Sequence, residues 1–212
     1  PDVLVDIGAP IEPPPLNRPS RDAGRWAWGF PPDSRVVLVY GGSQGSLGIN
    51  NAVREWVGAG LPSNTSLIWG TGKKTYDQFA ALESERVRVK PYLSPIADAY
   101  AATDLAVARA GTMTLAELFA WSIPAILIPL PTAAADHQTL NARTLEQAGA
   151  AIHLPQAKLS GARLGETVAS LLQDEPRMDA PARAPAVRAR PDAAAGIARR
   201  IVALAVRPRP GG

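Results

Sequence analysis

The stretch Arg35-Val-Val-Leu-Val-Tyr-Gly-Gly-Ser-Gln-Gly-Ser46 joins an apolar run to a glycine-rich turn. Residues 35–40 have the length and composition of a fully buried strand. The apolar positions that follow recur at the spacing of a helix: Ile49, Val53, Trp56 and Val57. A buried strand that passes through a tight turn into a helix is the first unit of an α/β fold.

The same alternation continues along the chain. Apolar runs typical of strands lie at residues 66–69, 87–90, 104–108, 124–128 and 151–154. Helical patterns follow them at residues 75–82, 96–102, 109–118, 136–148 and 164–172, with another at 193–206. Strands that are apolar on both faces predict a Rossmann-like, doubly wound parallel sheet. Such a sheet binds ligands just beyond the carboxyl ends of its strands, so the loops there are the candidate sites.

Composition narrows the function classes. The chain has 212 residues, of which 46% are hydrophobic and 19% charged, values typical of a globular domain with a core. No apolar run reaches the ~20 residues of a membrane span, and no signal-peptide pattern is present. The absence of cysteine excludes disulfides and thiolate sites and favours a cytoplasmic protein. A net charge of +3 is too small to indicate a nucleic-acid partner.

Three segments differ in composition. Residues 1–30 hold a strand-like run and a proline-rich crossing, and are interpreted as an interdomain connector. Residues 31–175 form the predicted ligand-binding domain, and residues 176–212 a Pro/Arg-rich segment with a C-terminal helix. Arginines crowd this last part: Arg183, Arg188, Arg190, Arg199, Arg200, Arg207 and Arg209. They are either a solvated surface or a basic face attracted to an anionic membrane.

The turn at residues 41–46 has the features of an anion-binding loop. Its glycines let backbone amides approach a phosphate, and the N-terminus of the next helix adds partial positive charge. Ser43, Gln44 and Ser46 add side-chain donors. The turn matches neither the dinucleotide fingerprint nor the Walker A loop. It is therefore either a phosphate site or an ordinary strand-to-helix turn.

Two further loops follow predicted strands. In the first, residues 109–117, Thr114 and Glu117 have the spacing of a capping box, which would make Glu117 structural. The alternative is a carboxylate that accepts hydrogen bonds from ribose hydroxyls. The second leads into a helix at Asp136, which could be its N-cap. The sequence shows no serine nucleophile elbow and no metal-ligand cluster, so recognition of phosphate and hydroxyl groups is the chemistry these loops share.

Taken in order, three motifs resemble the MurG family of glycosyltransferases. They are Gly-Gly-Ser-Gln-Gly at 41–45, Arg-Ala-Gly-Thr-Met-Thr-Leu-Ala-Glu at 109–117, and Pro-Ala-Ile-Leu-Ile-Pro-Leu at 124–130 with Asp-His-Gln-Thr-Leu-Asn-Ala at 136–142. The resemblance implies the C-terminal half of a GT-B fold, in which two Rossmann-like domains face a cleft. It also implies binding of UDP-GlcNAc for transfer of N-acetylglucosamine to lipid I in peptidoglycan synthesis, with no cofactor and no metal.

The resemblance assigns donor-binding roles position by position. Ser43 and Gln44 match the pair that contacts the donor, while Gly42 and Gly45 give the backbone room. Leu93 sits where the family holds the uracil edge through backbone groups.

The remaining donor-binding positions lie on the second and third loops. The turn that faces the diphosphate corresponds to Gly111, Thr112 and Met113. Glu117 matches the acid that binds the ribose hydroxyls, which favours that role over capping. Gln138 matches a glutamine that recognises the sugar, with His137 beside it and Asn141 one helical turn further along.

Two positions depart from the family pattern. Family members carry a Gln-Gln pair where this chain has His137-Gln138, which leaves the sugar open. The connector reads Ile7-Gly-Ala-Pro-Ile-Glu12, whereas the family pattern Thr-Gly-Asn-Pro-Val-Arg supplies an arginine for the phosphates. Glu12 would repel a diphosphate at close range. It therefore points away, or the donor is held differently.

The catalytic residues are expected outside this chain. In the family, the acceptor loops, the candidate general base and the membrane-docking patch belong to the N-terminal domain. The expected partners are therefore a UDP-sugar, a lipid-linked acceptor bound through that domain or a partner chain, and the cytoplasmic face of the inner membrane as a peripheral contact.

Several alternatives remain. The chain is a fragment, the donor half of a split transferase like the eukaryotic dolichol-linked enzyme, or a paralogue that uses another sugar or acceptor. A non-catalytic interaction module and a sugar-nucleotide epimerase of the same architecture are the alternatives from other classes.

Overall fold

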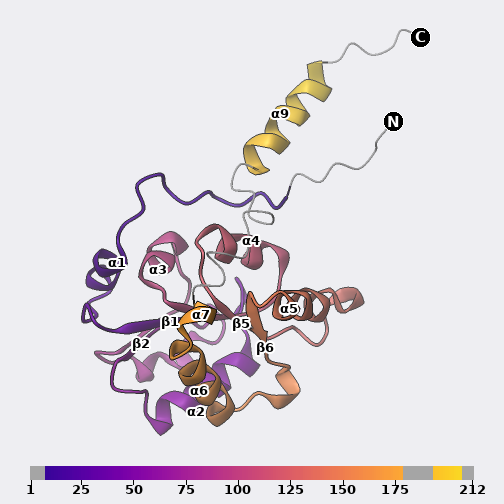
Figure 1. The fold of residues 1–212 in the computed structure, drawn as a ribbon. Coiled ribbons are helices and arrows are strands. Elements are labelled where there is room, and N and C mark those ends of the chain that lie inside the picture. The colour runs from indigo at the N-terminus through magenta and orange to yellow at the C-terminus, as the bar shows by residue number, and fades with distance from the viewer. Residues whose placement is uncertain (1–7, 179–192, 207–212) are drawn as a thin grey trace.

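A computed structural model describes residues 8–178 and 193–206, and a six-stranded parallel sheet lies at its centre (Figure 1). The strands are β1 (Arg35–Tyr40), β2 (Thr65–Gly70), β3 (Val87–Lys90), β4 (Leu105–Ala108), β5 (Ala125–Leu127) and β6 (Ala151–His153). Their order is β3-β2-β1-β4-β5-β6. This is the doubly wound, Rossmann-like sheet that the alternation of strands and helices predicts, and the predicted fold class is confirmed.

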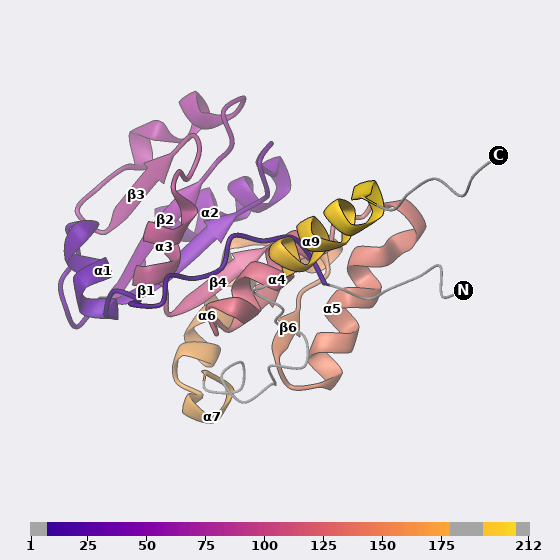
Figure 2. The same cartoon turned by 90° about the horizontal axis from the view of Figure 1, so that it is seen from above.

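Helices cover both faces of the sheet (Figures 1 and 2). They are α1 (Arg21–Ala27), α2 (Leu47–Ala59), α3 (Ile96–Ala102), α4 (Thr112–Ala120), α5 (His137–Gln147), α6 (Gly161–Leu172) and α7 (Glu175–Met178). A further helix, α9 (Ala193–Val206), projects away from the sheet (Figure 1). Alternate residues of β1 enter two separate cores. Val36 belongs to the core that also contains residues of α3, α4 and α5, whereas Val37 belongs to the core that contains residues of α2 and α6.

The strand order reverses direction between β1 and β4. From β1 the chain adds β2 and β3 on one side, then returns through α3 and adds β4, β5 and β6 on the other. Tyr40 and Ala108 end these two central strands side by side. The loops that start at Gly41 and Arg109 therefore lead away in different directions and leave a crevice between them.

Residues 8–30 contain a helix that the sequence analysis does not predict. Ser20 caps α1, and Gly24 lies so close to α3 that a Cβ there would be 2.7 Å from the carbonyl carbon of Ala101. The guanidinium of Arg25 forms a buried ion pair with Asp104, just before β4, at 3.0 Å. These contacts attach the predicted connector firmly to the sheet.

Other elements differ in detail from their predictions. The helix expected at 75–82 is two short 3₁₀ turns, η1 (Tyr76–Gln78) and η2 (Ala80–Leu82). They meet at Phe79, whose φ of −125° and ψ of −12° interrupt the helix while its buried ring packs on Trp69. The expected helix at 193–206 is present as α9.

Some predictions fall on residues outside the described ranges. The strand-like run lies mainly in residues 1–7, and most of the predicted Pro/Arg-rich segment lies in residues 179–192 and 207–212. Within the described ranges, none of the helices has the length and apolar character needed to cross a bilayer.

Candidate functional site

Two cavities open at the carboxyl end of the sheet, one on each side of the loop at residues 41–46. The first, of about 560 Å³, lies between the ends of β1, β2 and β3 and the start of α4. The second, of about 640 Å³, lies between the start of α2 and the loop that leads to α5. Gly42, Ser43 and Thr114 line both. The loop therefore forms a shared wall, an arrangement suited to a ligand with two parts.

The glycine-rich loop adopts a conformation that requires its glycines. Gly42 and Gly45 have φ of +87° and +75°, in the left-handed region that strains other residues. Ser46 then caps α2, and its hydroxyl accepts a hydrogen bond from the amide of Ile49 at 3.4 Å. The first turn of α2 lines the second cavity, so the positive end of the helix dipole lies there. This geometry favours the anion-binding interpretation over a plain turn.

Arg109 places a buried positive charge at the second cavity. Its Nη2 donates to Ser46 Oγ and Gln156 Oε1, both at 2.6 Å. Its Nη1 donates to the carbonyl oxygens of Ile128 at 3.0 Å and Pro129 at 2.8 Å. No carboxylate of the described residues forms an ion pair with Arg109, and burial lowers its pKa. No role for Arg109 is predicted from the sequence, although its position directly after a strand is a signal that could have marked it.

Glu117 lines the first cavity, and a tyrosine hydroxyl from another helix donates a hydrogen bond to its carboxylate. It is half-buried, and its Oε2 accepts a hydrogen bond from the hydroxyl of Tyr100 at 2.8 Å. The capping-box interpretation is wrong, because α4 begins at Thr112 with Gly111 as its N-cap. Thr114 thus lies inside the helix and cannot cap it. The carboxylate is available to a ligand.

The other predicted residues divide between the two cavities. Leu93 and Met113 line the first, and Leu93 also packs against the end of β2. Gln44, Gly111 and Gln138 line the second. The Oε1 of Gln138 accepts a hydrogen bond from the backbone amide at position 130, at 3.0 Å, which leaves its Nε2 as a donor.

Thr112, His137 and Asn141 line neither cavity. Thr112 and Asn141 border a separate groove between α4 and α5, and the Nδ2 of Asn141 donates to the carbonyl of Ala110 at 3.0 Å. The Nδ1 of His137 lies 2.7 Å from the carbonyl oxygen of Ala134. Asp136 occupies the N-cap position of α5 but makes no capping hydrogen bond from its side chain.

Glu12 lines the first cavity together with Glu117. Of the two alternatives that the sequence leaves for this residue, its position at the cavity favours the one in which the donor is held differently from the family pattern. Two carboxylates therefore border one compartment. Tyr40 and Thr114 also line it, although neither was among the predicted site residues.

The statistical model of the glycosyltransferase family 28 C-terminal domain matches residues 36–197, a range that contains the sheet except for Arg35 and the lining of both cavities except for Glu12. The chain belongs to this family. Among the described residues of this family 28 domain, no cluster of three or more His, Asp or Glu could hold a metal ion.

The relatives of this family 28 domain are longer proteins. It is 46% identical over 191 residues to the UDP-N-acetylglucosamine–N-acetylmuramyl-(pentapeptide) pyrophosphoryl-undecaprenol N-acetylglucosamine transferase of Salinibacter ruber, covering 89% of this chain and 51% of the relative. The transferase of the same name from Chlorobium phaeobacteroides is 38% identical over 186 residues, covering 87% and 51%. The chain spans about half the length of these curated relatives.

A solved structure agrees with the sequence relatives. The crystal structure of MurG from Acinetobacter baumannii superimposes with a TM-score of 0.68 and 25% identity, covering 89% of this chain and 54% of that one. The resemblance to the MurG family is confirmed, and the fold is that of the C-terminal half of a GT-B glycosyltransferase.

Proposed function

We propose that this chain binds UDP-GlcNAc as the donor in transfer of N-acetylglucosamine to a lipid-linked acceptor, lipid I, in peptidoglycan synthesis. The observation that carries the proposal is the position of Glu117 beside the glycine-rich loop. A carboxylate that can accept from vicinal hydroxyls and an amide-rich anion site line one cavity. The names of the relatives supply the identity of the donor and the acceptor.

The two cavities divide the donor between them in this proposal. The uracil lies near Leu93, the ribose hydroxyls bind Glu117, and the diphosphate lies along Gly42 and Ser43. The sugar extends past the shared wall into the second cavity, where the Nε2 of Gln138 is a donor.

The reaction requires stabilisation of the negative charge that develops on the leaving group. The acceptor hydroxyl attacks the anomeric carbon as the bond from that carbon to the β-phosphate oxygen breaks, and negative charge grows on the departing UDP. The loop amides, the N-terminus of α2 and the guanidinium of Arg109 are fixed positive groups beside this position, so they stabilise that charge without a metal or cofactor. We assign no general base to this chain and expect it in the acceptor-binding half of the enzyme.

Calorimetry tests the donor proposal. We expect heat with UDP and UDP-GlcNAc and none with ADP, with UDP-Glc as a test of sugar selectivity. Glu117→Ala should lower the affinity for UDP by roughly 10- to 100-fold, since hydrogen bonds to a charged group contribute about 1.5–3 kcal/mol. Glu166→Gln, on the exposed face of α6, is the control and should bind as the parent chain does. Absence of heat with any uridine nucleotide at millimolar concentration would refute the proposal and favour an interaction module.

We also propose peripheral contact with an anionic membrane through α9. Arg199 and Arg200 are exposed on this helix beside Ile201 and Val202, each 61% exposed. Cations and apolar side chains together suit the interface of an anionic bilayer. Co-sedimentation with phosphatidylglycerol vesicles but not with phosphatidylcholine vesicles is expected, and alanine at both arginines should abolish it. Equal binding to both vesicles would contradict an electrostatic contact.

A further inference from the structure

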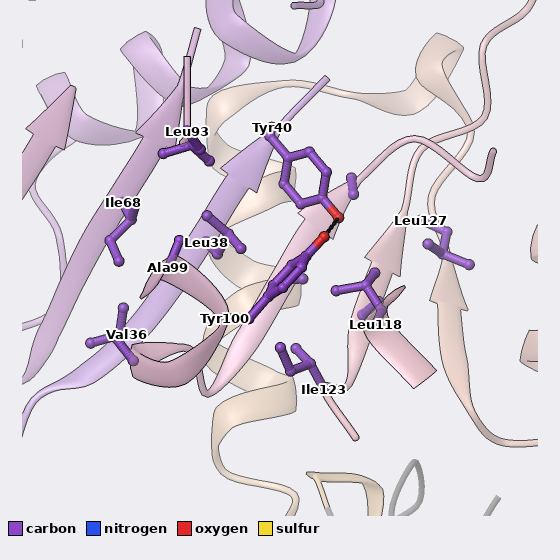
Figure 3. Packing of buried hydrophobic residues seen from close by; sticks show 14 of the residues in the cluster. Val36, Leu38, Tyr40, Ile68, Leu93, Ala99, Tyr100, Leu118, Ile123 and Leu127 are labelled. Atoms are coloured by element: carbon purple, nitrogen blue, oxygen red, sulfur yellow. Dashed lines mark hydrogen bonds between the residues drawn. The ribbon is translucent and has the colours of Figure 1, made fainter. Parts of the chain in front are cut away.

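Three side chains from three separate elements form a chain of hydrogen bonds that ends at the first cavity. Tyr40 is the last residue of β1, Tyr100 lies on α3 and Glu117 on α4. The hydroxyls of the two tyrosines are 3.0 Å apart, and Tyr100 donates to Glu117 Oε2 at 2.8 Å. Figure 3 shows the two phenols pointing toward one another above Leu118 and Ile123.

The chain of hydrogen bonds has a single direction. A carboxylate accepts and does not donate, so the one proton of the Tyr100 hydroxyl is given to Glu117. Tyr40 must then donate to the oxygen of Tyr100. Burial raises the pKa of both phenols well above the ordinary tyrosine value, so both keep their protons in neutral solution. The donor that faces Glu117 is therefore constant.

The rings are also held in place. Tyr40 and Tyr100 are 6% and 3% exposed, and their rings meet edge to face with centroids 6.4 Å apart. Tyr100 packs on its other side against Trp121, at 5.8 Å between centroids. A donor on a buried ring that packs against two aromatic neighbours fixes the position of one oxygen of Glu117. The described residues offer no hydrogen bond to Oε1, so that oxygen can accept from a ligand.

We propose that Tyr100, supported by Tyr40, is a positioning residue that preorganises Glu117 to accept a pair of neighbouring hydroxyls on a nucleoside diphosphate. The inference rests on the proposed function, because it needs the ribose of the donor to lie at Glu117. The proposal concerns specificity: the hydrogen bonds from Tyr40 through Tyr100 to Glu117 contribute to binding only when the ligand carries the two neighbouring hydroxyls. Without Tyr100, the carboxylate must be ordered at each binding event.

The test compares UDP with 2′,3′-dideoxy-UDP, which lacks both hydroxyls. The parent chain should prefer UDP. Tyr100→Phe should lower the affinity for UDP by about 3- to 10-fold, which is the cost of ordering one flexible side chain. The same substitution should lower the affinity for the dideoxy compound by less than about twofold. Tyr40→Phe should show a smaller loss in the same direction. Tyr76→Phe, a matched change on η1 away from both cavities, should leave both affinities unchanged.

Each outcome decides the inference. If Tyr100→Phe keeps the parental preference for UDP, the inference is wrong while donor binding stands. If Tyr100→Phe weakens both ligands equally, the role of Tyr100 is structural and the inference is again wrong. If the parent chain binds no uridine nucleotide, the proposed function fails and the inference fails with it. Thermal unfolding checks that the variants fold; if Tyr100→Phe does not, the preference of Tyr40→Phe for UDP decides, and an unchanged value overturns the inference.

Discussion

Alanine at Gly42 and at Gly45 should separate stability from ligand binding, because the two glycines share a backbone conformation but not their surroundings. Both have φ in the left-handed region, at +87° and +75°. A Cβ on Gly45 would collide with the carbonyl oxygen of Thr71 and lie 3.0 Å from the Cα of Gly72. A Cβ on Gly42 would meet nothing within 4 Å. The first substitution therefore adds a backbone clash that the second lacks.

The expected magnitudes follow from these contacts. The left-handed conformation costs alanine about 1–2 kcal/mol at either position. Gly45→Ala adds overpacking of about 1–3 kcal/mol, so it should lose about 2–5 kcal/mol in all. In a chain of this size 1 kcal/mol shifts Tm by roughly 2–4 °C, which gives a fall of roughly 4–20 °C for Gly45→Ala and roughly 2–8 °C for Gly42→Ala.

The losses of affinity for UDP should follow the opposite order to the losses of stability, with the larger loss for Gly42→Ala. The methyl group of Gly42→Ala occupies space that both cavities share, where the diphosphate is proposed to lie. Thermal unfolding by circular dichroism gives the Tm values, and calorimetry with UDP below both transitions gives the affinities. We expect Gly42→Ala to be the more stable variant and the weaker binder. Equal losses of Tm, or UDP binding by Gly42→Ala at the parental affinity, would refute this reasoning.

Three other perturbations have definite expected results. Asp104→Ala should cost about 3–5 kcal/mol in urea unfolding because it removes the buried carboxylate of the Arg25 guanidinium and leaves only the exposed Asp22 as its ion-pair partner; a loss below about 1 kcal/mol would contradict this. Glu12→Gln should raise the affinity for UDP in calorimetry by removing a like charge, and a gain that does not shrink with added salt would count against an electrostatic cause. Burial raises the pKa of Tyr40 and Tyr100, so the stability they contribute is present below about pH 10 and lost as the pH rises further. Urea unfolding should show this alkaline decline, and an equal decline in Tyr100→Phe would argue against it.

The strands could be predicted because the sheet is covered on both faces. Val36, Val37, Leu38 and Val39 are all fully buried, so the run is apolar throughout and easily recognised. Helix α1 could not be predicted in the same way. It has seven residues, too few to show a period, and its main anchor joins Arg25 to Asp104 across 79 positions of sequence. Such a contact leaves no local pattern.

The location of the candidate site could be predicted from the sequence, but the hydrogen-bond partners of its residues could not. The rule that ligands bind beyond the carboxyl ends of parallel strands led directly to the loops after β1 and β4. The spacing of Thr114 and Glu117 suggested a local capping role, yet Glu117 bonds Tyr100, which comes from another helix. Pairings of this kind depend on how helices are placed on the sheet, and that is decided by packing.

The shared wall between the two cavities has a consequence for inhibitor chemistry. Because Gly42, Ser43 and Thr114 border both compartments, a fragment found in one and a fragment found in the other would lie close together. Joining them past Gly42, where no side chain stands, would make the second contact intramolecular, with an effective concentration in the millimolar range for a short linker. Two weak fragments could thus yield one tight compound, and the absent side chain of Gly42 provides the path for the link.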